Sequence, residues 1–196
     1  MASKTLRELT GLDQTPASLA DATLILVDYQ NTYTRGALEL EGWDAALDAA
    51  ADVLARAREA GATVVHVQHD GGEGSAYDIR AEIGRIHPRV VPVDGEAVVV
   101  KTAPNSFVGT DLGERVDAAG NKDVVVIGFM THMCVTFTSE GAFLRGNRPT
   151  VVADACATRP LRALDTDVSA DQLHRSALAT ISDIYGVVVP SASDLR

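Results

Sequence analysis

The sequence VVVIGFMTHMCVTFTSE, residues 124–140, decides how the rest of the chain is interpreted. Its first residues, Val124 to Ile127, are apolar and mostly β-branched, which predicts a strand buried on both faces, as in a parallel sheet. Gly128 interrupts this run, and residues 129–133 are predicted to form a tight turn. Cys134 then falls in the first turn of a predicted helix. The stretch therefore predicts a strand, an elbow and a helix with a cysteine at its start.

A cysteine at such an elbow has the surroundings that a nucleophile needs. The N-terminus of a helix carries partial positive charge and unpaired backbone N–H groups. Both favour a thiolate over a thiol, and both can stabilise a developing oxyanion. We therefore predict that Cys134 is a nucleophile. The alternative interpretation of the same position is a small apolar residue that fills the core.

Composition favours one folded domain in this chain of 196 residues. Hydrophobic residues make up 46% and charged residues 22%, which argues against disorder. The formal net charge of −10 argues against nucleic acid or an anionic membrane as partner, because both require clustered Lys and Arg. No apolar run reaches the roughly 18–20 residues of a membrane-spanning helix. Residues 1–22 do not resemble a secretory signal, and the two cysteines are expected to be free thiols, so we expect a cytoplasmic protein.

Strands and helices alternate along the chain. The predicted strands cover residues 23–29, 63–67, 97–100, 124–127, 150–153 and 186–189. The predicted helices cover residues 43–60, 112–119, 134–144 and 170–183. This alternation predicts one α/β domain over residues 21–196, with three layers (α/β/α) and a six-stranded, parallel, doubly wound sheet. Residues 1–20 are predicted to be an N-terminal extension with a short helix near residues 6–12, which can pack on a neighbouring subunit.

Two long loops are predicted between these elements. Residues 69–96 are rich in glycine and proline, with a short helix expected near residues 78–83. Residues 156–168 are expected to form a variable loop. Long loops in compact domains usually carry function, so we expect these two to determine the substrate.

Three polar residues stand at one predicted edge of the sheet. Asp28 ends the first strand, Lys101 follows the third, and Cys134 follows the fourth. Ligands of such sheets bind beyond the carboxyl ends of the strands. Asp28 can accept the proton of Cys134, and Lys101 can balance the charge of both, while the backbone N–H groups of Met130 and Cys134 can bind an oxyanion. The sequence thus favours acyl transfer to water, with a turn-forming Asp28 and a solvated Lys101 as the alternative.

Other cysteine chemistries and a metal site lack the residues they need. A phosphatase loop requires Arg six residues after the cysteine, where Glu140 stands, and a dithiol site requires a second cysteine where Phe137 stands. His69, Asp70 and His87 share the first long loop, but no His–x–x–x–His or Asp–x–His spacing fixes them on one element. We therefore expect neither a metal ion nor another cofactor.

Four segments resemble the isochorismatase-like cysteine hydrolases. They are LVDYQNTY (26–33), VVVKTAPNSF (98–107), GFMTHMCVTFT (128–138) and VVADACAT (151–158). The resemblance implies a six-stranded parallel sheet and an Asp–Lys–Cys triad formed by Asp28, Lys101 and Cys134. It also implies a cis peptide bond between Phe129 and Met130, with the Met130 N–H turned toward the oxyanion. Homologous enzymes are commonly oligomers, so a homodimer or homotetramer is implied.

The subgroups of this family differ in substrate. Nicotinamidases carry an Asp–x–His metal motif after the second strand, and VQHDGGEG (67–74) departs from it. Some isochorismatases cleave a vinyl ether and lack the cysteine, so Cys134 indicates amide hydrolysis instead. The segments TYTRGALELEG (32–42), HDGGEGSAYDIRAEIG (69–84) and FMTHMCV (129–135) most resemble the subgroup that includes streptothricin hydrolase, which opens a lactam amide.

These loops also supply candidate substrate-binding residues, each of which could instead serve packing. They are Asn31, Tyr33, Trp43, Tyr77, Phe107, Phe129, His132 and Met133. The leading hypothesis is a metal-independent cysteine hydrolase that cleaves a small amide or lactam through a thioester. The alternatives are an isochorismatase-type vinyl ether hydrolase and a catalytically silent binding protein.

Overall fold

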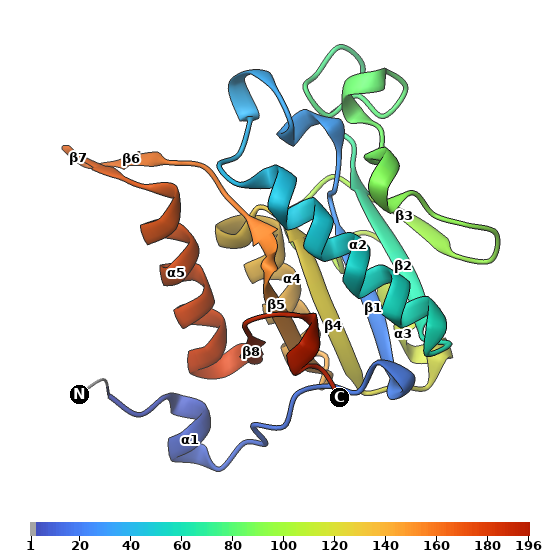
Figure 1. The fold of residues 1–196 in the computed structure, drawn as a ribbon, viewed down its shortest axis with the longest axis vertical. Coiled ribbons are helices and arrows are strands. Elements are labelled where there is room, and N and C mark those ends of the chain that lie inside the picture. The colour runs from blue at the N-terminus through green and yellow to red at the C-terminus, as the bar shows by residue number, and fades with distance from the viewer. Residues whose placement is uncertain (1–2) are drawn as a thin grey trace.

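A computed structural model describes residues 3–196 of the chain (Figure 1). The strands are β1 (Ala22–Val27), β2 (Thr63–His69), β3 (Ala97–Lys101), β4 (Asp123–Phe129), β5 (Arg148–Ala157), β6 (Leu161–Ala163), β7 (Thr166–Val168) and β8 (Val187–Val189). The helices are α1 (Leu6–Thr10), α2 (Trp43–Glu59), α3 (Leu112–Ala119), α4 (Thr136–Leu144) and α5 (Ala170–Thr180). A π-helical turn, Thr131–Val135, leads into α4, and a second one, Ile181–Tyr185, extends α5.

Six strands form one parallel sheet in the order β3-β2-β1-β4-β5-β8. The chain therefore starts in the middle of the sheet, winds to the β3 edge, returns to β4 beside β1 and continues to the β8 edge. This arrangement confirms the predicted doubly wound α/β fold. The strand order reverses between β1 and β4, which is where sheets of this type bind ligands.

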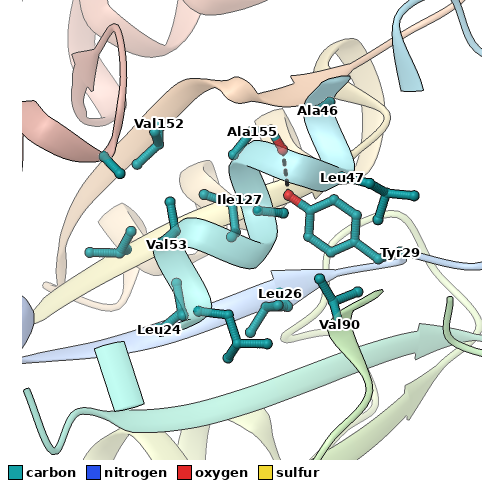
Figure 2. Packing of buried hydrophobic residues seen from close by; sticks show 14 of the residues in the cluster. Leu24, Leu26, Tyr29, Ala46, Leu47, Val53, Val90, Ile127, Val152 and Ala155 are labelled. Carbon is teal, nitrogen blue, oxygen red and sulfur yellow. Dashed lines mark hydrogen bonds between the residues drawn. The ribbon is translucent and has the colours of Figure 1, made fainter. Parts of the chain in front are cut away.

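Helices cover both faces of the sheet. Alternate residues of β1 show this, because Leu24 and Leu26 belong to the core beneath α2, whereas Ile25 and Val27 belong to the core shared with α3 and α4. Figure 1 shows α2 crossing one face, and Figure 2 shows Leu24, Leu26 and Val53 packed between α2 and the strands. Each such buried side chain contributes roughly 1.5–3 kcal/mol relative to an exposed one.

Two loops differ from the sequence-based expectation. Residues 156–168 do not form an irregular loop, because β5 continues to Ala157 and β6 pairs antiparallel with β7. Residues 78–83 do not form a helix. The Asp78 carboxylate accepts hydrogen bonds from the backbone N–H groups of Gly74 and Arg80, which favours a turn, and the short 3-10 turns Glu82–Gly84 and Pro88–Val90 follow.

The N-terminal extension packs on its own chain. Thr5 caps α1, whose first residue donates its N–H to Asp183 Oδ1 at 2.8 Å. The guanidinium of Arg7 is buried and donates to the carbonyl of Ile184 at 3.2 Å. The extension thus holds the end of α5, while its packing on a neighbouring subunit stays a prediction. Across residues 3–196, no helix is both long and apolar enough to cross a membrane.

Candidate active site

The predicted triad residues meet at the carboxyl edge of the sheet. Asp28 follows β1, Lys101 ends β3, and Cys134 lies in the π-helical turn after β4. The Nζ atom of Lys101 lies 2.7 Å from Asp28 Oδ2 and 3.4 Å from Cys134 Sγ. The exposed fraction is 0% for Asp28, 1% for Lys101 and 5% for Cys134. The structure therefore places an acid, a cation and a thiol in one buried cluster.

Neighbouring backbone bonds hold Asp28 in place. Its φ of 55° is left-handed, a conformation that Asp tolerates better than most residues. The Asp28 N–H donates to the carbonyl of Val67 at 3.0 Å, which ties the end of β1 to β2. On the other side, the hydroxyl of Tyr29 donates to the carbonyl of Ala155 in β5 (Figure 2). The carboxylate is thus fixed between the two halves of the sheet.

His69 belongs to the cluster, although the sequence suggests it only as a possible metal ligand. It ends β2 in register with Lys101, and its Nδ1 lies 3.2 Å from Lys101 Nζ. Lys101 also donates to the carbonyl of Ala103 at 3.0 Å. Burial and then the charge of Lys101 lower the pKa of His69 to about 4, so the imidazole is neutral at pH 7 and accepts a hydrogen bond. Its place at a strand end was the signal that could have revealed it.

The electrostatics of the cluster keep the proton on sulfur at rest. Burial, followed by the negative charge of Asp28, raises the pKa of Cys134 to about 12, and Lys101 only partly opposes this rise. The expectation of a resting thiolate is therefore wrong. Burial also raises the pKa of Asp28, against the opposing effect of Lys101. Apart from the Lys101 ion pair, no group within residues 3–196 donates a well-aligned hydrogen bond to the Asp28 carboxylate, so lone pairs remain for a proton.

The elbow before Cys134 has the predicted backbone. The peptide bond between Phe129 and Met130 is cis, as the family resemblance implies. Gly128, with a φ of 150°, allows β4 to approach β1, because a Cβ atom at this position would lie 2.2 Å from the carbonyl oxygen of Val27. Glycine at position 128 therefore allows β1 and β4 to stay paired as far as the elbow.

Four of the predicted pocket residues lie around the cluster or its elbow. The hydroxyl groups of Tyr33 and Tyr77 are 3.2 Å apart, and burial followed by the charge of Asp28 raises the pKa of Tyr33 well above its usual range. The Nδ1 atom of His132 lies 2.5 Å from Thr158 Oγ1, and His132 also lines a cavity of about 360 Å³ between α4 and α5. Met133 is half-buried and packs against both cores.

Asn31 and Phe129 have structural contacts. The Asn31 side chain donates to the carbonyl of Glu82 at 2.8 Å, which ties two loops together. Phe129 is fully buried and packs edge-on against Tyr29 and Tyr33, with ring centroids 4.7 and 5.7 Å apart. Phe129 therefore belongs to the core that supports the site.

Trp43 and Phe107 stack with arginine side chains. The guanidinium of Arg89 lies 5.9 Å from the centre of the Trp43 ring at the start of α2. The guanidinium of Arg145 lies 5.4 Å from the centre of the Phe107 ring. Neither contact involves a residue of the buried cluster, so substrate binding by Trp43 or Phe107 stays a prediction.

The three loop residues considered as metal ligands have other contacts. His69 faces Lys101, Asp70 pairs with Arg80 at 3.2 Å, and His87 Nδ1 accepts the N–H of Arg89 at 3.3 Å. In the part of the chain that the structure describes, no group of three or more His, Cys, Asp or Glu side chains is arranged to hold a metal ion.

The six-stranded parallel sheet, covered by helices on both faces and carrying this polar cluster at its carboxyl edge, has the three-layer α/β/α fold of isochorismatase-like hydrolases. The Isochorismatase domain model matches residues 22–193, and the chain belongs to the isochorismatase family, whose members are hydrolases.

Both structural and sequence relatives lie in that family. The structure resembles an isochorismatase from Pseudomonas putida KT2440 with a TM-score of 0.96, at 37% identity over 100% of both chains. The sequence is 33% identical to the secreted isochorismatase effector Isc1 of Verticillium dahliae, over 94% of this chain and 96% of that protein. It is 35% identical to streptothricin hydrolase of Streptomyces noursei, over 87% of this chain and 63% of that protein.

These comparisons confirm the family resemblance and include the expected subgroup. Streptothricin hydrolase is a relative, but its 35% identity is close to the 33% of the fungal effector. The comparisons therefore place the chain in the family without separating the subgroups. Because one relative is a secreted protein, a cytoplasmic location stays a prediction.

Proposed function

We propose that this protein is a cysteine amidohydrolase that cleaves a C–N bond of a small amide or lactam, with Asp28, Lys101 and Cys134 as its triad. One observation carries the proposal. Lys101 Nζ contacts both Asp28 Oδ2, at 2.7 Å, and Cys134 Sγ, at 3.4 Å, in a nearly closed site. A buried thiol beside a carboxylate with free lone pairs is an arrangement suited to nucleophilic catalysis.

The first half of the reaction forms a thioester. Asp28 accepts the proton of the Cys134 thiol while the sulfur attacks the carbonyl carbon of the amide. The resulting oxyanion accepts hydrogen bonds from the backbone N–H groups of Met130 and Cys134. Asp28 then gives its proton to the nitrogen, the C–N bond breaks, and the amine leaves. Because the thiol pKa is about 12, proton transfer accompanies the attack and does not precede it.

The second half releases the acid and restores the enzyme. Asp28 accepts a proton from water, and the resulting hydroxide attacks the thioester carbon. The C–S bond breaks and the sulfur regains its proton. The ion pair between Lys101 and Asp28 keeps the carboxylate available as a base. Neutral His69, which accepts a hydrogen bond from Lys101, orients the ammonium group.

Two kinds of relative support amide hydrolysis. Streptothricin hydrolase shares 35% identity with this chain, and a maleamate amidohydrolase of Pseudomonas putida shares 28%. We propose that a small amide or lactam is likewise the substrate here, in a cytoplasmic enzyme that needs no metal.

The two buried cysteines provide a matched test. Both are 5% exposed, and burial raises the pKa of each to about 12, but only Cys134 contacts Lys101. We expect Cys134→Ala to abolish amine or ammonia release from a library of small amides and lactams, and Cys156→Ala to retain it. Circular dichroism checks that both variants fold. Full turnover by Cys134→Ala would overturn the proposal.

The structural match to a protein described as an isochorismatase favours one alternative, vinyl ether hydrolysis. Incubation with isochorismate and measurement of pyruvate separates it from amide hydrolysis. Pyruvate release that persists in Cys134→Ala would support the alternative, because that chemistry does not require the thiol. A third alternative, a silent binding protein, predicts that the wild-type protein releases neither product.

A further inference from the structure

The β6–β7 hairpin has no support from the rest of its chain. Figure 1 shows β6 and β7 extending beyond the start of α5, away from the central sheet. The two strands pair with each other, and no hydrogen bond or ion pair joins residues 161–168 to any other part of the chain between residues 3 and 196. A two-stranded hairpin on its own is at best marginally stable in water. This hairpin therefore needs a further surface to hold its shape.

The tip of the hairpin carries a leucine that its own chain does not bury. Leu164 is 96% exposed, more than any other large apolar side chain among residues 3–196. Its φ of 53° is left-handed, a conformation that is unfavourable for residues with a Cβ atom and that turns usually give to glycine. An exposed leucine in this conformation gains free energy only if another molecule covers it.

A groove of matching character lies between α4 and α5. Its volume is about 360 Å³, and Phe137, Leu173 and Tyr185 form much of its apolar lining. A cavity of about 150 Å³ already holds a benzene-sized group, so this groove can hold a leucine side chain together with part of a neighbouring residue. His132, two residues before Cys134, also lines the groove. A molecule bound there therefore contacts the elbow that carries the proposed nucleophile.

The charges beside the hairpin tip and in the groove are opposite in sign. Arg162 lies two residues before Leu164, and Glu140 lines the groove. Neither side chain forms an ion pair with any residue between 3 and 196, whereas Arg145 pairs with Asp117 and Arg175 with Asp171. Arg162 Nε donates only to the carbonyl of Leu164, at 3.3 Å. Insertion of the tip into such a groove brings the two unpaired charges together.

We propose that the β6–β7 hairpin is an arm that inserts Leu164 into the α4–α5 groove of a second copy of this chain, while the arm of the second copy enters the groove of the first. The hairpin extends away from its own domain, so the groove it fills belongs to another molecule (Figure 1). Each chain carries both an arm and a groove, and a two-fold axis uses both contacts twice and closes the assembly. The arm of the partner then packs against His132, so each copy contributes to the surroundings of the other's elbow. The proposal does not depend on amide hydrolysis.

The first experiment measures assembly. Light scattering coupled to gel filtration gives the mass over a dilution series for the wild type, Leu164→Ser and the control Val98→Ser, which truncates a side chain 41% exposed on the edge strand β3. Two leucines leave water in each pair, so Leu164→Ser should weaken association at least about hundredfold. Its mass should be half that of the wild type where the wild type is assembled. Val98→Ser should keep the wild-type mass.

Exchange of the two charges tests the pairing of arm and groove. Arg162→Glu and Glu140→Arg should each weaken association at least about tenfold, because each places like charges together at two contacts. The double variant restores opposite charges and should regain most of the lost affinity. Failure of the double variant to recover would count against the proposed contact.

A cross-link between copies identifies the two surfaces. Ser176 lines the groove, and both native cysteines are buried. Leu164→Cys protein mixed with Ser176→Cys protein should form a 164–176 disulfide in oxidised glutathione, as peptide mass spectrometry detects. Leu164→Cys mixed with Glu59→Cys, at the far end of α2, is the control and should not cross-link.

Four results would overturn the proposal. They are a wild-type mass of one chain at all concentrations, association that survives Leu164→Ser, loss of association in Val98→Ser alone, and absence of the 164–176 disulfide. The first result would leave the arm to a different partner, and the third would place the interface on β3. Circular dichroism checks that the variants fold, as is expected of substitutions at exposed positions.

Discussion

At the scale of single residues, the Asp28 carboxylate decides whether Cys134 can react. The thiol is protonated at rest, with a pKa of about 12, and in the proposed mechanism Asp28, whose carboxylate has free lone pairs, accepts its proton. Cys156 has the same exposure and a similar pKa, but its Sγ lies 3.4 Å from the carbonyl oxygen of Val152. The two thiols therefore differ mainly in the group that can receive a proton.

This difference predicts selective alkylation by iodoacetamide. At pH 7 we expect Cys134 to be labelled at least about tenfold faster than Cys156, because transfer of its proton to Asp28 produces the nucleophile. Asp28→Asn also removes the negative charge that raises the pKa of Cys134, but we expect loss of the proton acceptor to dominate, so that the variant loses the advantage and the Cys156 rate is unchanged. Peptide mass spectrometry over a time course measures both rates in one sample. Equal rates in the wild type would contradict the role given to Asp28.

The sequence could identify site residues that directly follow an apolar strand. It could not identify residues whose place in the site depends on the register of the strands. Asp28, Lys101 and Cys134 each follow an apolar run, and parallel strands bring such positions to one edge. His69 also ends a strand, but its length and register could not be read from the mixed sequence VQHD.

At the scale of elements, Glu96 in the segment before β3 joins α2 and β2, through an ion pair with Arg58 and a hydrogen bond with His66. Glu96 accepts hydrogen bonds from Arg58 Nε at 2.7 Å and from the Val93 N–H at 3.0 Å, and its Oε2 lies 2.8 Å from His66 Nε2. Burial alone would raise the pKa of Glu96, but these bonds outweigh it and lower the pKa to about 2. Burial lowers the pKa of His66, although Glu96 opposes this effect.

Both shifts predict a loss of stability in acid. The unfolded chain binds protons at His66 below a pH of about 6.5 and at Glu96 below about 4.5. The folded protein takes up these protons only at lower pH, so the free energy of unfolding decreases across both ranges as pH falls. For Glu96 this amounts to about 2–3 kcal/mol between pH 4.5 and 2. Thermal unfolding at a series of pH values should show the decrease.

Glu96→Gln should make the thermal unfolding temperature depend less on pH in the acid range. It should also lower the unfolding temperature at pH 7. Glu82→Gln is the control, because Glu82 pairs with Arg35 at the surface, where ion pairs contribute little. If Glu82→Gln changed the acid stability as much as Glu96→Gln, the loss of stability in acid could not be attributed to the buried position of Glu96.

Elements were predictable where one physical signal dominated. The core strands are apolar runs, and α2 is an Ala-rich helix with Gly61 beyond its end in a left-handed conformation. The β6–β7 hairpin was missed because its residues are exposed or half-buried, so no period of buried residues marks it. The turn at Asp78 was missed because side-chain hydrogen bonds to the backbone override helix propensity.

At the scale of the whole molecule, apolar side chains remain exposed in places that a second copy could cover. Val98 and Val100 are 41% and 45% exposed on β3, which is an edge strand of the sheet. Phe137 and Leu144 are 40% and 71% exposed on α4. Open edges and exposed apolar patches are typical of surfaces that associate.

We therefore retain the prediction of a homodimer or homotetramer. Light scattering coupled to gel filtration should give a mass of two or four times the 20.6 kDa of the chain, and the mass should hold over a tenfold dilution if the interface is specific. Arg7→Ala, which loosens α1 from Ile184 by removing a buried hydrogen bond, tests whether the extension contributes. If the extension serves only its own chain, this variant will lower the thermal midpoint, as loss of about 1–3 kcal/mol implies, and leave the mass unchanged. A mass of one chain at all concentrations would contradict the oligomer, and the exposed side chains of β3 and α4 would then need another explanation.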